Sequence, residues 1–228
     1  TEVARIDLGG QPDSVAVSPN GQFAAIAIEN ERDEDLGDGK PPQAPAGYLS
    51  IIGLQGQPNT WTATRVDMTG TSALYAGDPE PEYVDINNDN TAVMTMQENN
   101  HLVLVHLPSA KITAQFTAGA IDLTNIDTTE EDPARILLTE TQTKRLREPD
   151  GVSWITNKLF ATANEGDMDG GSRSFSIFDT DGQVIFDSGN ALEHQAVRVG
   201  HYPDARSGNK GTEQMGISNA ICKVPECQ

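Results

Sequence analysis

The chain has 228 residues and a formal net charge of −19 at pH 7, since 34 acidic side chains oppose 15 basic ones. Such a charge argues against nucleic acid and anionic membranes as partners, because both repel a strongly negative surface. Aromatic residues make up only 5% and hydrophobic residues 36% of the chain, and no apolar run is long enough for a transmembrane helix. The composition fits one well-solvated domain, as in many secreted proteins.

The first predicted elements lie in residues 11–29, which read QPDSVAVSPNGQFAAIAIE. Apolar residues alternate on both sides of Asn20-Gly21, and this pattern predicts two short strands joined by a hairpin turn. Asn-Gly is typical of such turns because both residues tolerate positive φ. Two more strands are predicted over residues 48–54 and 62–68, after a polar loop.

The same pattern returns twice, from Glu80 (EPEYVDINNDNTAVMTMQENN) and from Glu148 (EPDGVSWITNKLFATANEGD). Its prolines are Pro12, Pro81 and Pro149, which gives a period of 69 and then 68 residues. The third and fourth strands of the later copies are predicted at residues 101–107 and 111–116, and at 173–179 and 183–187. A repeat of this size sets the architecture of the whole chain.

Four short antiparallel strands per repeat describe the blade of a β-propeller. The predicted fold is therefore all-β, with one partial propeller over residues 1–228 and blades at about 11–68, 80–116 and 148–187. No segment shows sustained helical periodicity. Residues 1–8 are expected to form the outer strand of a preceding blade, and residues 210–228 to begin a fourth copy and end in a divergent tail.

A closed propeller needs roughly four to eight blades, and this chain supplies about three. We therefore expect the ring to be incomplete or to be completed by further blades. These would come from a longer parent chain or from another protein chain. A three-bladed arc alone leaves sheet faces and edges uncovered.

Each copy ends its second strand at a carboxylate, about 17 residues after its proline. Because the first two strands of a blade run antiparallel, the start of the first and the end of the second lie at one end of the blade. Six acids are therefore expected to gather at one mouth of the channel, namely Asp13, Glu29, Glu82, Glu98, Asp150 and Glu165. Asp167 and Asp169 directly follow Glu165 and share this predicted face.

Carboxylates so close together cannot all remain ionised without compensation. Bound Ca²⁺, cationic partners or strongly raised pKa values would each relieve the repulsion. Alternatively, each acid simply accepts hydrogen bonds from loop amides and caps a strand or turn. For the set as a whole, the sequence favours metal or ligand binding, with Ca²⁺ as the expected ion.

The sequence carries no standard catalytic motif, since G-x-S-x-G, a phosphate-binding Walker loop and H-E-x-x-H are all absent. Arg145 and Arg147 precede the third copy and are candidates for binding a phosphate or carboxylate group, unless they pair with nearby acids. His201 is a candidate general base. Cys222 and Cys227 fit a small disulfide-closed loop, but two free or intermolecular cysteines would give the same sequence.

Several blocks of this sequence resemble the choice-of-anchor I family of secreted bacterial propellers, which is related to esterase-like phytases. The resemblance covers residues 11 to about 216 and rests on these blocks: PDSVAVSPNG, EPEYVDIN with MTMQENN, REPDGV with ATANEGD, FDSGN and KGTEQMG. It implies an extracellular, periplasmic or surface-attached propeller with an acidic, calcium-binding face, and phosphoesterase activity as a further option. The positions that it singles out are Glu98, Asn99, Asn164, Glu165 and Asp167.

Two functions of different classes follow from this reading. The first is an extracellular calcium-binding module for binding or assembly, in which the gathered acids hold Ca²⁺. The second is a metal-dependent phosphoesterase, in which the ion activates water while Arg145, Arg147 or His201 steadies a phosphate-bearing substrate. Since propellers support both functions, the fold alone does not choose between them.

Overall fold

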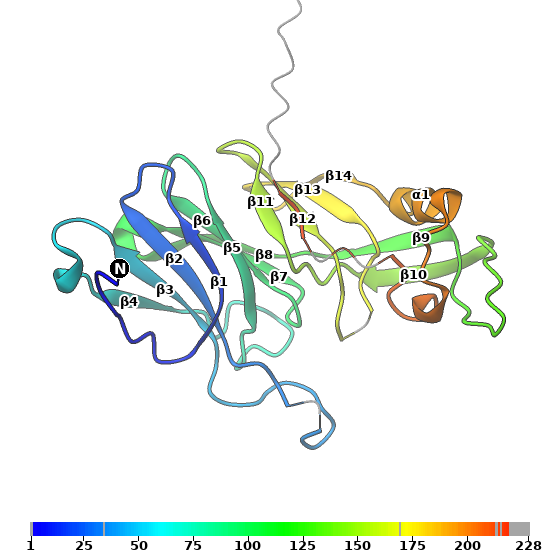
Figure 1. Ribbon diagram of the computed structural model, residues 1–228, viewed down its shortest axis with the longest axis horizontal. Coiled ribbons are helices and arrows are strands. Elements are labelled where there is room, and N and C mark those ends of the chain that lie inside the picture. The colour runs from blue at the N-terminus through cyan, green and yellow to red at the C-terminus, as the bar shows by residue number, and fades with distance from the viewer. Residues whose placement is uncertain (1, 34, 169, 213, 215, 219–228) are drawn as a thin grey trace, which may run out of the picture.

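The computed structural model describes residues 2–33, 35–168, 170–212, 214 and 216–218. It contains three four-stranded antiparallel sheets, which we call blades one to three (Figure 1). Blade one is β1 (Gln11–Val17), β2 (Phe23–Glu29), β3 (Tyr48–Gly53) and β4 (Ala63–Asp67). Blade two is β5 (Pro81–Ile86), β6 (Thr91–Met96), β7 (His101–His106) and β8 (Lys111–Thr117). Blade three is β11 (Val152–Trp154), β12 (Leu159–Ala163), β13 (Phe175–Asp179) and β14 (Val184–Asp187).

Within each blade, the strands are ordered as they occur in the chain, and each pairs antiparallel with the next. The first strands β1, β5 and β11 lie next to one another, so each blade begins at a shared inner edge. This arrangement confirms the predicted partial propeller of four-stranded blades. The first hairpin turn also forms as expected, with Gly21 at a φ of 68° and the Ser18 N–H donating to the Phe23 carbonyl at 2.8 Å.

Apolar side chains that alternate along the strands pack between neighbouring blades. Ala25, Ala27 and Ile51 of blade one pack against Ala92 and Met94 of blade two, and all five are almost completely buried. The second interface is aromatic: blade two contributes Phe116, and blade three contributes Trp154, Phe160 and Phe178. Burial of these side chains is the main force that stacks the blades.

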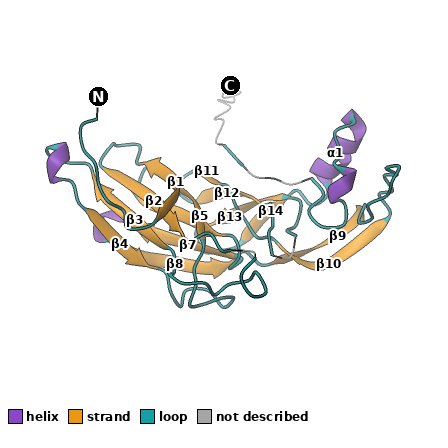
Figure 2. Cartoon of the chain, turned by 60° about the horizontal axis from the view of Figure 1, so that its bottom comes forward, coloured by secondary structure: helices purple, strands orange, loops and turns teal. Residues whose placement is uncertain are grey.

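A two-stranded sheet and a helix lie outside the blades and were not predicted. The strands β9 (Ala120–Ile126) and β10 (Glu140–Leu146) form a separate two-stranded sheet between blades two and three in the chain. The helix α1 (Ala191–Val199) follows β14 and lies near this hairpin at one end of the molecule in both views (Figures 1 and 2). The helix α1 is nine residues long and was not expected, since no segment of the sequence shows sustained helical periodicity. Three short 3₁₀ turns, η1 (Pro58–Thr60), η2 (Leu107–Ser109) and η3 (Asp204–Arg206), complete the structure.

The two flanking segments do not form the expected strands. Residues 2–8 have no strand, although Ile6 and Leu8 pack against the outer face of blade one. The described residues between 207 and 218 also lack a strand, and Glu213 of the expected fourth copy lies outside the described residues. In the described part of the chain, no helix has the length and apolar character needed to cross a lipid bilayer.

A buried ion pair fastens α1 to blade three. The Arg173 Nη1 donates to Glu193 Oε1 at 2.8 Å, and both side chains are completely buried. The same guanidinium donates to the Asp127 carbonyl at 2.8 Å and to the Ser207 carbonyl, while the Tyr202 hydroxyl donates to Glu193 Oε1 at 2.7 Å. One cation thus ties the hairpin, the helix and the following loop together.

Candidate functional site

Irregular strand pairing places two of the predicted acids at the inner edge. In blade one, the pairing of β1 with β2 shifts between Pro12 and Ser14, which leaves Asp13 out of register. In blade two, the pairing of β5 with β6 shifts between Pro81 and Val84, at Glu82. Such irregularities bend a strand and re-aim its side chains. In blades one and two, the repeated Pro-acid pattern therefore marks an irregular strand start.

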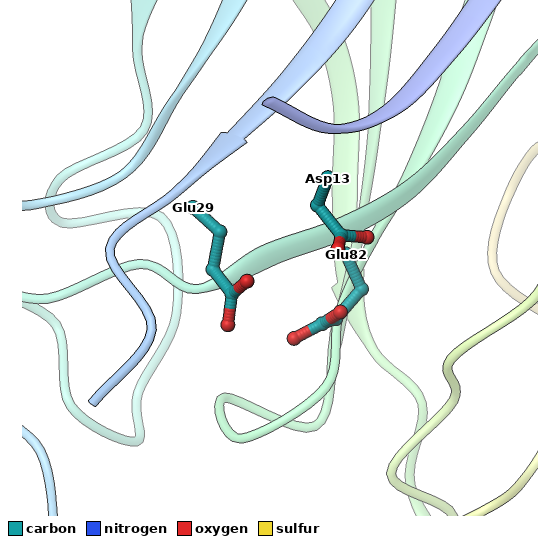
Figure 3. Close-up of side chains that lie close together, drawn as sticks. All are labelled: Asp13, Glu29 and Glu82. Carbon is teal, nitrogen blue, oxygen red and sulfur yellow. The ribbon is translucent and has the colours of Figure 1, made fainter. Parts of the chain in front are cut away.

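Asp13, Glu29 and Glu82 come together at this edge. One carboxylate oxygen from each lies within 4.8 Å of the other two, and this is the group of possible metal ligands found among the described residues. Figure 3 shows the three carboxylates turned toward a common space, with Asp13 and Glu29 from blade one and Glu82 from blade two. The cluster therefore spans two blades.

The three acids line an open depression of about 320 Å³. Its other walls are Gln11, Glu31, Arg32, Gln97, Glu98 and Asp167. Arg32 is the basic member of this set, and its guanidinium contacts Glu98 Oε1 at 3.0 Å and also Asp167 Oδ2. The other oxygen of Glu98, Oε2, has no hydrogen-bond partner, although the residue is only 5% exposed.

Burial and mutual repulsion raise the pKa values of these carboxyl groups. Burial together with the charges of Glu98, Glu29 and Asp13 raises the pKa of Glu82 to about 11. Burial raises the pKa of Glu29 to about 7, with the charge of Asp13 adding to the effect, and the pKa of Asp13 is raised for the same main reason. The pKa of Glu98 rises to about 8, chiefly through burial. Without a bound cation, this mouth therefore retains protons at neutral pH.

The acids of blade three extend the same electrostatic group. Burial and the adjacent charge of Glu165 raise the pKa of Asp150 to about 7, and the charges of Asp13 and Glu29 contribute. Glu165 accepts from Gln97 Nε2 and from Lys210 Nζ, both at 3.4 Å. Each of the six repeated carboxylates thus interacts with at least one other, and Asp13, Glu29 and Glu82 are the three that approach closely enough to share an ion.

Of the two acids that follow Glu165, the structure describes Asp167 but not Asp169. Asp167 pairs with Arg32, and its backbone N–H donates to Glu148 Oε2 at 2.6 Å. It therefore lines the depression but is held by a guanidinium. Asp169 lies outside the described residues, as do Cys222 and Cys227, so that the predicted ligand and the predicted disulfide stay predictions.

Glu80 is a buried acid near this site that was missed as a candidate. It is 1% exposed, and neither of its carboxylate oxygens has a hydrogen-bond partner. Burial and the charges of Asp78, Glu98 and Glu29 raise its pKa to about 9. The signal was its place directly before Pro81, which Glu148 repeats before Pro149. The backbone N–H groups of Glu80 and Glu148 each donate to an asparagine side chain, at 2.9 Å.

The asparagines singled out by the family resemblance support the backbone. The Asn99 side chain accepts from the Glu80 N–H, and its Nδ2 donates to the Asp78 carbonyl at 3.0 Å. Asn164 is completely buried and donates to the hydroxyls of Ser174 and Ser176. Both side chains hold loops in place around the acidic mouth.

The three candidate catalytic residues lie in different surroundings. Arg147 is 6% exposed, and its guanidinium donates to Asp187 Oδ2 at 3.0 Å and to the Ala118 carbonyl at 2.8 Å. It therefore serves as a brace between the end of blade two and blade three. Arg145 is half-buried and contacts Gln142 at 3.3 Å, while His201 is exposed just beyond α1.

One comparison with known proteins identifies a family. A protein-family model described as "Choice-of-anchor I domain" matches residues 62–170 and 168–222. No curated protein matches the chain.

Solved structures that match the chain include virginiamycin B lyase from Staphylococcus aureus, with 14% identity, a TM-score of 0.43 and coverage of 78% of this chain and 40% of that one. They also include the periplasmic gluconolactonase of Pseudomonas aeruginosa, with 9% identity, a TM-score of 0.41 and coverage of 77% of this chain and 41% of that one. The chain thus spans about two fifths of each.

Proposed function

Because the chain belongs to the choice-of-anchor I domain family, we propose that it is an extracellular or cell-surface propeller module that binds calcium at the acidic mouth. The family description, with its reference to an anchor, supports a place at the cell surface. The proposed role is binding or assembly outside the cell.

One observation carries the calcium proposal: oxygens of Asp13, Glu29 and Glu82 lie within 4.8 Å of one another. Calcium binds oxygen ligands at about 2.3–2.6 Å, so two ligands on opposite sides of one ion are about 5 Å apart. The three oxygens therefore fit around a single ion. Glu98 Oε2, which is buried and unpartnered beside them, is available as a further ligand.

The chemistry of the donors also favours a hard divalent cation. All three groups are carboxylates, and Gln11 and Gln97, whose side-chain amides each carry a further oxygen, also line the depression. The raised pKa values show that the same groups hold protons when no cation is present. A divalent ion would replace these protons and neutralise the repulsion between blades one and two.

The proposal is tested by titrating calcium into the wild type and the Glu82→Gln variant by calorimetry. We expect wild-type binding in the range of about 10⁻⁴ to 10⁻³ M that is usual for extracellular calcium modules. Loss of one charged ligand should weaken binding at least about tenfold, because a hydrogen-bonding amide replaces a charge. Glu130→Gln, a change of the same kind at an exposed position in the loop between β9 and β10, is the matched control.

Two results would contradict calcium binding at this mouth: no heat of binding in the wild type, or equal affinities in the wild type and Glu82→Gln. The phosphoesterase hypothesis is checked on the same samples with a generic phosphomonoester. Calcium-dependent hydrolysis that disappears in Glu82→Gln would favour an enzyme. No contact among the described residues favours the phosphoesterase. Arg147, one candidate for binding phosphate, already donates from its guanidinium to Asp187 and to the Ala118 carbonyl.

A further inference from the structure

A pair of acids, Asp78 and Glu80, lies enclosed in the segment just before β5. Each residue is 1% exposed. Three of their carboxylate oxygens, Asp78 Oδ1 and both oxygens of Glu80, receive no hydrogen bond from the described residues. The remaining one, Asp78 Oδ2, accepts from the Gln43 backbone N–H at 2.6 Å. Buried polar atoms in folded proteins nearly always have partners, so three carboxylate oxygens without a donor need an explanation.

The two carboxyl groups are in contact, and their surroundings are negative. Burial raises the pKa of Glu80, and the charges of Asp78, Glu98 and Glu29, together with a direct contact of the Asp78 side chain, raise it further. Among the described residues, no basic side chain forms an ion pair with Asp78 or Glu80. Two ionised carboxylates are not stable in contact inside a protein, so a proton or a cation must lie between them.

The backbone around the pair is fixed from two sides. The buried Asn99 side chain accepts from the Glu80 N–H at 2.9 Å and donates to the Asp78 carbonyl at 3.0 Å. From blade one, the Gly47 N–H donates to the Pro79 carbonyl at 3.0 Å. The approach is so close that a Cβ at position 47 would come within 2.6 Å of that carbonyl oxygen. Both acids are therefore held in place by the fold itself.

The third copy of the repeat shows that the fold does not need such a pair. Glu148 stands where Glu80 does, directly before the repeated proline, and it is also completely buried. However, Glu148 Oε2 accepts from the Asp167 backbone N–H at 2.6 Å. The residue that matches Asp78 in this copy is Leu146. Blade two thus has a second acid that the repeat does not require, and its glutamate lacks the donor that Glu148 has.

We propose that Asp78 and Glu80 hold a second calcium ion, separate from the one at Asp13, Glu29 and Glu82. The three oxygens without donors are its first ligands, and backbone carbonyls or water complete the shell. A divalent ion neutralises both carboxylates, whereas one bridging proton neutralises only one and leaves an oxygen of the pair without a partner. Magnesium keeps several of its waters when it binds, so an enclosed site suits calcium better.

The second site does not rest on calcium binding at the acidic mouth, because its ligands are different residues. The two sites are neighbours, since the charges of Glu29 and Glu98 raise the pKa values of both Glu80 and Glu82. Each site must therefore be tested with its own variant, and the two losses must be counted separately.

The test is the number of calcium ions bound per chain, counted by equilibrium dialysis at physiological ionic strength. Long dialysis allows for slow exchange from an enclosed site. We expect Glu80→Gln and Asp78→Asn each to bind one ion fewer than the wild type and to keep the ion at the mouth. Glu82→Gln should lose the other ion, and the double variant of Glu80 and Glu82 should lose both. Glu130→Gln, at an exposed position, is the control and should bind as the wild type does.

Thermal unfolding separates the loss of a ligand from damage to the fold. In Glu80→Gln, the new amide can donate to Asp78 Oδ1, so in chelator this variant should melt no lower than the wild type. In calcium, the wild type should gain more in melting temperature than the variant, because only the wild type fills the second site. A variant that is merely damaged would melt lower in both conditions and still gain as much from calcium.

Equal ion counts in the wild type and Glu80→Gln, with equal gains in melting temperature from calcium, would overturn the proposal and leave only a proton between the two acids. Loss of an ion in Glu80→Gln but not in Glu82→Gln would contradict the mouth and support the second site, and the reverse pattern would do the opposite. Magnesium that displaces calcium from Glu82→Gln at equal concentration would overturn the choice of ion.

Discussion

At the scale of single residues, Asp13 and Glu82 owe their place at the mouth to irregular strand starts. A regular strand would pair these residues across the sheet and direct successive side chains to opposite faces. The shifts between Pro12 and Ser14, and between Pro81 and Val84, release them from that alternation. The proline matters because it donates no backbone hydrogen bond to the neighbouring strand.

The raised pKa values predict how stability depends on pH when no divalent cation is present. Glu29 and Asp150 have pKa values of about 7 in the folded protein, against 4.5 and 3.8 in an unfolded chain. Between these values the folded protein holds more protons than the unfolded chain, so the free energy of unfolding falls as pH rises. The stabilising contribution is complete below about pH 4 and is lost as pH rises through about 7.

We therefore expect the melting temperature in chelator to fall from about pH 5 to pH 8, as measured by scanning calorimetry. Excess calcium should flatten this dependence, because the ion replaces the protons. The variant Glu29→Gln should show a shallower fall than Glu130→Gln, which serves as the control. A melting temperature in chelator that rises over this pH range would contradict the prediction.

The sequence analysis found the acids that recur in the repeat, but it missed Glu80, an acid near the site that the folded chain buries almost completely. Asp13, Glu29 and Glu82 were found because the spacing from proline to carboxylate is nearly constant. Glu80 was overlooked because its one sequence signal, the place directly before a repeated proline, does not reveal that tertiary packing encloses the side chain. Its burial depends on the loops before β5 and around Gln43, whose backbone N–H donates to the neighbouring Asp78 at 2.6 Å.

At the scale of elements, the twelve blade strands were predictable because the repeat places short apolar or alternating runs between turn signals in each of its three copies. The hairpin β9–β10 was harder to predict, since β10 reads ETQTKRL, has few apolar residues and contains no buried residue. The helix α1 has nine residues, and the residue that it buries is the charged Glu193. An apolar stripe is the usual signal of a helix, and here an ion pair takes its place.

This ion pair gives a prediction about α1. The variant Glu193→Gln leaves the completely buried Arg173 guanidinium without its counter-charge, so it should cost about 3–5 kcal/mol of stability. Urea unfolding measures the loss, and hydrogen exchange should show faster opening of residues 191–199. Arg198→Gln, an exposed charge on the same helix, should cost less than about 1 kcal/mol. Equal stabilities of the two variants would mean that the pair does not hold the helix.

At the scale of the whole molecule, the contact between blades two and three depends on a cluster of aromatic rings. The centroid of Phe160 lies 5.3 Å from that of Trp154, 5.8 Å from that of Phe178 and 6.4 Å from that of Phe116. Phe116 comes from the outer strand of blade two, so the cluster joins two sheets. The inner strand of blade three is only three residues long, which makes this packing more important.

Phe160→Ala should therefore destabilise the protein by about 3–5 kcal/mol, the usual cost of removing a buried aromatic ring. The loss is measured by urea unfolding, with the midpoint and slope compared with those of the wild type. Phe186→Ala removes the same side chain from a 48% exposed position on β14 and should cost less than about 1 kcal/mol. An equally small effect at Phe160 would show that the cluster is not what joins the blades.

The position of the three clustered carboxylates on two different blades has a mechanical consequence. A calcium ion held by Asp13, Glu29 and Glu82 would link the two sides of the seam between blades one and two, in addition to the apolar contacts between these blades. Pulling the blades apart would then require the ion to lose its ligands from one side. In single-molecule stretching, calcium should raise the force at which this seam ruptures and leave the seam between blades two and three unchanged. The load that this seam bears would then depend on the calcium concentration around the protein.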